Sequence, residues 1–215
     1  MSKPSESPWP IELSPSFRFF RPLIIALGSI LLFLLGPVRV RGKSNIPRTG
    51  GVLLLLNHIS DVDPVVTQYA CRRHVYFISK SELFEMPSIS WFLRMWRSFP
   101  IRRNEPDRTA LKHAIRLLEL GHVVCLYPEG QLSADGELLE ILPGAALIAR
   151  SAGVPVVCGG IVGTSKIIPY GTVIPRPALG GVRVTWGQPR SVSKADEATE
   201  FTSWVRSELL RLTDR

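Results

Sequence analysis

The sequence has 215 residues, enough for one domain with a full hydrophobic core and too few for several. Its 45% hydrophobic content and mean hydropathy of +0.15 are high for a freely soluble domain, so a surface that faces a membrane is expected. The formal net charge of +8 favours an anionic partner, and because no zinc-finger spacing or RNA-recognition signature is present, we expect phospholipid and no nucleic acid. Cys71, Cys125 and Cys158 lie far apart in apolar surroundings, which predicts reduced core thiols in a protein that faces the cytoplasm.

The N-terminal part of the chain predicts a membrane anchor. Residues 1–16 are rich in proline and serine and are expected to be disordered. An almost wholly apolar run follows from Pro22 to Val38, and as a helix it would be roughly 25 Å long, against a bilayer core of about 30 Å. Residues 17–43, the run with its basic flanks, are therefore expected to be an uncleaved anchor that spans the membrane or lies in one leaflet. A buried core helix is the alternative.

Strands and helices alternate through the remainder, residues 44–215. Strands are expected at 38–40, 52–56, 75–79, 99–101, 123–127 and 155–162, and helices at 64–73, 88–97, 106–120, 144–151 and 197–212. An alternating strand at 182–186 is expected to close an edge of the sheet. This order predicts an α/β fold with a mostly parallel central sheet flanked by helices.

A histidine and an aspartate lie where the expected strand 52–56 ends. The junction with the following helix can fold the carboxylate of Asp63 back onto the imidazole of His58. Such a pair suits proton transfer, because a neutral imidazole takes a proton from a hydroxyl while the carboxylate fixes its tautomer and stabilises the imidazolium. The alternative is that His58 is a hydrogen-bonded loop residue and Asp63 a helix cap.

Two more polar loops follow expected strands, and ligands collect beyond the carboxyl ends of parallel strands. The first is Arg102-Arg103-Asn104, whose guanidinium groups suit a phosphate because their planar fork donates paired hydrogen bonds. The second is Pro128-Glu129-Gly130, which adds a carboxylate. The alternative for Arg102 and Arg103 is a solvated turn, and for Glu129 a turn residue held by Pro128 and Gly130. Ser60 lies too close to His58 in sequence for a good Ser-His pair, and no Gly-x-Ser-x-Gly elbow is present.

Four short segments in this order resemble the motifs of the glycerolipid acyltransferases, whose type member is 1-acylglycerol-3-phosphate acyltransferase. They are Asn57-His58-x4-Asp63, Phe99-Pro100-Ile101-Arg102-Arg103, Tyr127-Pro128-Glu129-Gly130 and Val154-Pro155-Val156-Val157. Each is weak alone, but four in order are fairly specific, and the similarity runs from about residue 38 to residue 187.

The resemblance implies a membrane-bound enzyme that moves a fatty acyl group from acyl-CoA or acyl carrier protein to 1-acyl-sn-glycerol 3-phosphate, giving phosphatidate. In that scheme His58 is the general base and Asp63 its partner. Arg103 holds the acceptor phosphate, and Arg102 beside it is counted among the substrate-binding residues. The remaining substrate-binding residues are Glu129 and Gly130, which position the glycerol, and Pro155, which shapes the acyl pocket. No cofactor or metal is implied beyond the thioester co-substrate.

Departures from the family pattern leave the acceptor open. The third segment continues as Gly130-Gln131-Leu132-Ser133, where members usually have Gly-Thr-Arg-Ser, so an arginine credited with phosphate binding is absent. In the second segment, Arg102 stands where aspartate is common, which adds a positive charge. A different lysolipid acceptor is therefore one alternative, and a non-catalytic lipid-binding membrane protein is another.

Overall fold

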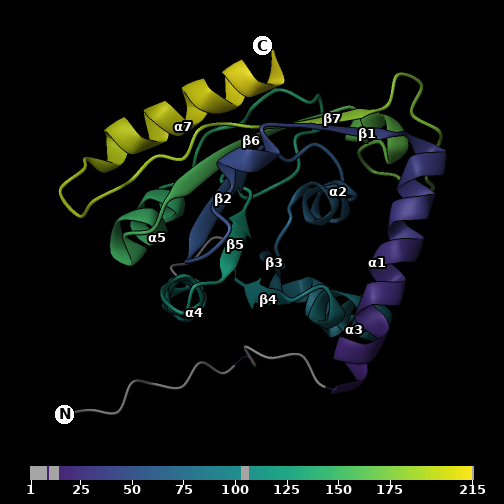
Figure 1. Ribbon diagram of the computed structural model, residues 1–215, viewed down its shortest axis with the longest axis horizontal. Coiled ribbons are helices and arrows are strands. Elements are labelled where there is room, and N and C mark those ends of the chain that lie inside the picture. Colours follow the sequence, from purple (N-terminus) through teal and green to yellow (C-terminus); the bar gives the residue numbers. More distant parts are fainter. Residues whose placement is uncertain (1–8, 10–14, 103–106, 215) are drawn as a thin grey trace.

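A computed structural model of the chain describes residue 9 and residues 15–102 and 107–214. Seven strands form one central sheet in the order β1-β7-β6-β2-β5-β3-β4 (Figure 1). The strands are β1 Val38–Arg41, β2 Val52–Leu56, β3 Val75–Lys80, β4 Ser98–Ile101, β5 Val123–Leu126, β6 Val156–Val162 and β7 Val182–Trp186. Every pairing of neighbours is parallel except that of β6 with β7. The predicted α/β fold with a mostly parallel sheet is confirmed.

Helices cover both faces of this sheet. They are α1 Pro15–Leu35, α2 Asp63–Ala70, α3 Pro87–Met95, α4 Arg108–Glu119, α5 Gly144–Ala152, α6 Thr164–Ile167 and α7 Ala198–Thr213, with 3-10 turns at Lys43–Asn45 and Ser81–Glu85. Side chains of α4, α5 and α7 pack on one face of the sheet, and those of α1, α2 and α3 on the other. The helices expected after residue 44 are all present, and α6 is one that the sequence did not predict.

Strand β2 is the centre of the core, because all five of its side chains are buried. Leu53 and Leu55 face α4, α5 and α7, whereas Leu54 and Leu56 face α1 and α2. A strand buried on both faces needs a continuous apolar sequence, and the run VLLLL supplies it. The three cysteines are free and buried as predicted.

The expectation that residues 182–186 close an edge of the sheet is wrong. Strand β7 lies between β1 and β6, and β1 is the edge strand. The reason is burial: Trp186 of β7 is only 2% exposed, and Gly159 of β6 makes room for it, since a Cβ there would lie 2.6 Å from the indole. Arg39 and Arg41 of β1 are exposed instead, which suits an edge.

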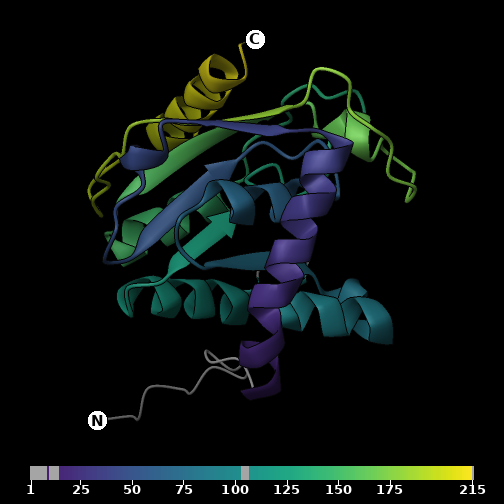
Figure 2. The same ribbon diagram turned by 45° about the vertical axis from the view of Figure 1, so that its right-hand side comes forward.

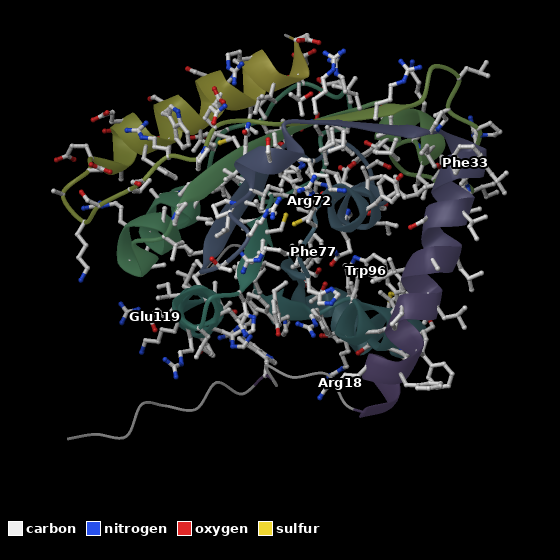
Figure 3. All side chains as sticks on the ribbon, in the orientation of Figure 1. Arg18, Phe33, Arg72, Phe77, Trp96 and Glu119 are labelled. Atoms are coloured by element: carbon white, nitrogen blue, oxygen red, sulfur yellow. The ribbon has the colours of Figure 1, made fainter. Side chains whose placement is uncertain are left out.

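Helix α1 lies along the side of the domain in both views (Figures 1 and 2). Leu32 is buried, and Ile24, Ile25 and Leu35 pack against the same core. The outer side carries exposed apolar residues, and Phe33 points away from the domain, whereas Trp96 points inward (Figure 3). Helix α1 is therefore not the buried core helix of the alternative interpretation.

The length and composition of α1 would also allow it to cross a membrane. The window Arg18–Leu35 has a mean hydropathy of 1.9, and 6% of it is buried. The expected disordered segment 1–16 lies outside the described residues, except for Trp9, Pro15 and Ser16. Within the expected anchor segment 17–43, β1 and the inner side of α1 contribute to the core of the domain.

The buried His113 of α4 predicts a pH dependence of stability. His113 is 2% exposed and meets the ring of Phe99 edge-on, with 4.6 Å between centroids. Burial lowers its pKa to about 4 from an ordinary value of 6.5. The unfolded chain therefore binds the proton first as the pH falls, and the folded state loses about 3 kcal/mol of stability through this residue between about pH 7 and pH 4.

We expect His113→Leu to remove this loss, so that the free energy of unfolding falls less steeply between about pH 7 and pH 4 than in the unaltered protein. Urea denaturation at several pH values measures the difference. His74→Leu is the matched control, because His74 is exposed. Parallel pH profiles for the His113→Leu variant and the unaltered protein would contradict the prediction.

Candidate active site

His58 and Asp63 form a hydrogen-bonded pair at the carboxyl edge of the sheet, just beyond β2. The Nδ1 atom of His58 lies 2.9 Å from Oδ2 of Asp63. The aspartate side chain is fully buried, and the histidine side chain is 13% exposed. The pair therefore has one end inside the protein and one end that a ligand can reach.

The buried carboxylate of Asp63 organises the whole loop. Its Oδ2 atom also accepts hydrogen bonds from the backbone N–H groups of Ile59 at 2.8 Å and Ser60 at 2.9 Å. The backbone N–H of Asp63 donates in turn to the carbonyl of Ser60, and Pro64 fits the first turn of α2, where no N–H partner is needed. Asp63 is thus the first residue of α2 and the acceptor that closes the preceding turn.

These contacts fix the protonation of the imidazole. Two backbone N–H groups can only donate, so Oδ2 of Asp63 acts as an acceptor, and Nδ1 of His58 must carry the hydrogen that it shares. In the neutral ring, Nε2 then has a free lone pair. That atom is the one available to take a proton from a ligand.

Tyr127 is a site residue that the sequence analysis did not single out. Its ring stacks on His58, with centroids 4.0 Å apart and an interplanar angle of 14°. The phenol oxygen of Tyr127 lies 3.3 Å from the hydroxyl oxygen of Thr67. Burial raises the pKa of Tyr127 well above its usual value. The stack covers one face of the imidazole and fixes the plane in which Nε2 points.

Glu129 supports the loops around the site through both carboxylate oxygens. Oε1 accepts from the backbone N–H of His58 at 2.9 Å, and Oε2 accepts from that of Leu139 at 2.8 Å. Burial raises its pKa, and these two hydrogen bonds oppose the shift. The support continues outward, because Arg206 of α7 donates to the carbonyls of Leu138 and Leu139.

Gly130 and Ser133 complete the same loop. Gly130 has φ of 71°, and a Cβ there would lie 2.5 Å from the side chain of Leu142, so glycine fits both the backbone and the space. The N–H of Ser133 donates to the carbonyl of His58 at 2.9 Å. Both backbone groups of His58 are therefore held by the segment that follows β5.

Asn57 and Ser60 have structural partners. The side chain of Asn57 accepts from the N–H of Ile161 at 2.7 Å and donates to its carbonyl at 2.9 Å, which ties the end of β2 to β6. The hydroxyl of Ser60 is buried and donates to the carbonyl of Ile168 at 2.8 Å. This contact leaves Ser60 without the geometry of a nucleophile.

The basic residues lie farther along the edge. Arg102 follows β4, which is separated from β2 by β5 and β3, so its backbone lies roughly 14 Å from that of His58 at about 4.8 Å per strand. Its guanidinium is exposed, with Nε 3.8 Å from Asp107. Lys80, the last residue of β3, lies between them and was also not singled out by the sequence analysis. Arg103 lies outside the described residues.

Pro155 is at the opposite edge. It precedes β6, and Val156 is in register with Leu53, so Pro155 lies roughly 20 Å from His58 at about 3.3 Å per residue. Its role in an acyl pocket stays a prediction, and only a long chain that follows the sheet would reach it. In residues 15–102 and 107–214, no group of three or more His, Cys, Asp or Glu side chains is placed to hold a metal ion.

Comparisons with known proteins give a family and several relatives. A family model described as Acyltransferase matches residues 37–162. The chloroplastic 1-acyl-sn-glycerol-3-phosphate acyltransferase of Arabidopsis thaliana is 32% identical over 88% of this chain and 54% of its own length. The 1-acyl-sn-glycerol-3-phosphate acyltransferase of Bacillus subtilis is 29% identical over 64% of this chain and 68% of its own length.

A solved structure shows the same fold. The crystal structure of the 1-acyl-sn-glycerophosphate acyltransferase from Thermotoga maritima has a TM-score of 0.75 and 25% sequence identity, and the match covers 95% of this chain and 84% of that one. The chain spans about half the length of two plant relatives, 54% of the one from Arabidopsis thaliana and 53% of the one from Brassica napus.

The double contact of Glu129 gives a testable prediction. Glu129→Gln replaces one acceptor oxygen with an NH2 group, which leaves the N–H of His58 or of Leu139 facing a donor. We expect a loss of about 1–3 kcal/mol in the free energy of unfolding and faster hydrogen exchange at one of these two amides. Mass spectrometry or NMR of the exchange measures it. Glu140→Gln, an exposed change of the same type, should leave both amides protected; equal protection in the two variants would contradict the assignment.

Proposed function

Because this chain belongs to the acyltransferase family, we propose that it moves a fatty acyl group from acyl-CoA or acyl carrier protein to the free hydroxyl of 1-acyl-sn-glycerol 3-phosphate, giving phosphatidate. The observation that carries the proposal is the hydrogen bond between His58 and Asp63 at an accessible edge of the sheet. The names of the relatives in Arabidopsis thaliana and Bacillus subtilis support the acceptor.

The proposed reaction is a single displacement without an enzyme nucleophile. Nε2 of His58 takes the proton of the acceptor hydroxyl while that oxygen attacks the thioester carbonyl carbon. The tetrahedral intermediate then collapses, the C–S bond breaks, and the imidazolium returns the proton to the leaving thiolate. Asp63 stabilises the imidazolium between these steps, and Tyr127 and Glu129 act as positioning residues for the ring and its backbone.

The acceptor phosphate is proposed to lie along the edge toward β3 and β4. Arg102 and Lys80 lie there with exposed side chains, paired with Asp107 and Glu82, and Arg103 follows Arg102 in the sequence. An extended Arg102 side chain would shorten the separation from His58 to what a glycerol phosphate spans. Leu132 stands where the family usually has an arginine, so these residues take over its role in the proposal. The same substitution favours the second candidate, an acyltransferase for another lysolipid.

The membrane is the proposed source of the lipid substrate. The exposed apolar side of α1 supports association with a bilayer, and its packing along the domain favours a position in one leaflet, with the domain on the cytoplasmic face. An acceptor held in that leaflet would reach His58 without leaving the lipid phase.

An assay of several lysolipids with labelled acyl-CoA tests the proposal. We expect lysophosphatidate to be the best acceptor, and His58→Ala to lower turnover by about 10²- to 10⁴-fold while the protein stays folded. His74→Ala, at an exposed histidine on the opposite edge, is the control. Near-normal turnover by His58→Ala would exclude His58 as the base. Preference for another lysolipid would support the second candidate, and lysolipid binding without thioester loss would favour a non-catalytic lipid-binding protein.

A second measurement tests the phosphate site. We expect Arg103→Ala to raise the KM for lysophosphatidate by roughly 10- to 100-fold and to leave the KM for the thioester nearly unchanged, because a charge-assisted hydrogen bond contributes about 1.5–3 kcal/mol. Arg102→Ala should have a smaller effect, since Asp107 already offsets its charge. Arg116→Ala on α4 is the control. An unchanged acceptor KM in Arg103→Ala would mean that the phosphate is held elsewhere.

A further inference from the structure

A cationic hollow opens at the β1 edge of the sheet, away from the His58 pair. Its volume is about 240 Å³. Basic side chains from three elements line it: Arg39 and Arg41 of β1, Lys166 of α6 and Arg183 of β7. The rest of its wall is Val162, Val182 and the glycines Gly163, Gly180 and Gly181. Strands β7 and β6 separate β1 from β2, and the hollow lies on the side of β2 opposite to Arg102 and Lys80, so it is distinct from the proposed reaction centre.

The cations of the hollow are gathered by strand register. Arg39 is paired with Arg183 across the parallel β1–β7 contact, and Arg41 is two residues farther along the same face. Like charges directly opposite one another on neighbouring strands are destabilising. Lys166 adds a further positive charge at the same place, so an anion in the hollow would reduce the repulsion among these cations.

One acidic group offsets part of this charge. Asp214, at the carboxyl end of α7, forms an ion pair with Arg183. Among residues 15–102 and 107–214, Arg39, Arg41 and Lys166 form no ion pair with any acidic side chain. Three of the four cations are thus available to an external anion.

An exposed apolar loop borders the hollow. The segment between α6 and β7 carries Val173, Ile174 and Leu179, which are 88%, 70% and 87% exposed. Side chains of this size, exposed together on one loop, indicate a contact with an apolar phase. Gly180 and Gly181 continue from this loop directly into the wall of the hollow.

The loop is also joined to the end of the apolar helix. The N–H of Ala178 donates to the carbonyl of Leu35, the last residue of α1, and that of Val182 donates to Pro37 at 3.0 Å. In both ribbon views the loop lies beside the end of α1 that leads into β1 (Figures 1 and 2). Phe33 and Leu34 there are 71% and 70% exposed. The apolar surfaces of α1 and of the loop therefore adjoin, with the cations at their margin.

We propose that the hollow binds the headgroup phosphate of an anionic phospholipid. This lipid belongs to the bilayer that α1 and the loop between α6 and β7 enter. The charge fits a phosphodiester, and the adjoining apolar residues place the hollow at the depth of the headgroups. The site would fix the orientation of the domain on the membrane. It goes beyond the proposed acyl transfer, because none of its lining residues takes part in that chemistry.

Partition of the full chain between buffer and vesicles tests the site. The protein is diluted out of detergent into vesicles of phosphatidylcholine alone or into vesicles that also contain phosphatidylglycerol. Flotation of the vesicles then measures the bound fraction of the protein. We expect the unaltered protein to prefer the anionic vesicles, and Arg39→Gln/Lys166→Gln to lower that preference by about 30-fold without changing partition to phosphatidylcholine. Neither residue has an ion pair to lose, so the fold should be retained, and thermal unfolding checks this.

The matched control is Lys112→Gln/Arg116→Gln on the exposed side of α4, which removes the same charge. The control should change the preference for anionic vesicles by less than about twofold. An equal loss of preference in both double variants, or no loss in Arg39→Gln/Lys166→Gln, would overturn the proposal. Displacement of the preference by inorganic phosphate at constant ionic strength would also overturn it, in favour of a free-anion site. Val173→Ser/Ile174→Ser should weaken partition to both kinds of vesicle by about tenfold or more.

The two proposals can fail separately. The Arg39→Gln/Lys166→Gln variant should keep its acyl transfer rate in detergent micelles, where no anionic bilayer is present. His58→Ala should keep the full preference for anionic vesicles. Loss of vesicle preference in His58→Ala would show that the preference depends on the reaction centre and would overturn the separate site.

Discussion

The burial of one carboxylate, that of Asp63, determines the arrangement of the candidate site. A charged group removed from water needs hydrogen-bond donors around it, and the loop from His58 to Ser60 provides three, two from the backbone and one from the imidazole. The same contacts to Oδ2 thus set the loop conformation, the tautomer of His58 and the start of α2. The other oxygen, Oδ1, is buried with no hydrogen-bond partner among the described residues.

The sequence predicted the sheet and this pair for a simple reason. A fully buried strand requires an unbroken apolar run, and the polar residues that follow such a run leave the core at its end, so His58 and Asp63 were expected at the same strand-to-helix junction. The position of Pro155 could have been inferred from the same parallel order, because a residue that precedes a strand lies at the edge opposite to residues that follow one.

Other features depend on pairings between distant segments, which a single sequence does not specify. Tyr127 stacks on His58 only because β5 lies next to β2 in a particular register. The alternating pattern of β7 fits an edge strand as well as an inner one, and the deciding contact, Trp186 over Gly159, joins residues of two strands. The grouping of Arg39 with Lys166 and Arg183 likewise arises from the tertiary fold, since each is an ordinary surface cation in the sequence.

A series of hydrogen bonds connects the C-terminal helix α7 to the backbone of His58. It runs from Arg206 through Leu139 and Glu129. Each link joins a side chain to a backbone group, so the backbone of His58 is positioned by the Glu129 loop, which in turn contacts α7. Substitutions in α7 are therefore a route by which the geometry of the site can change without altering any residue that contacts a ligand.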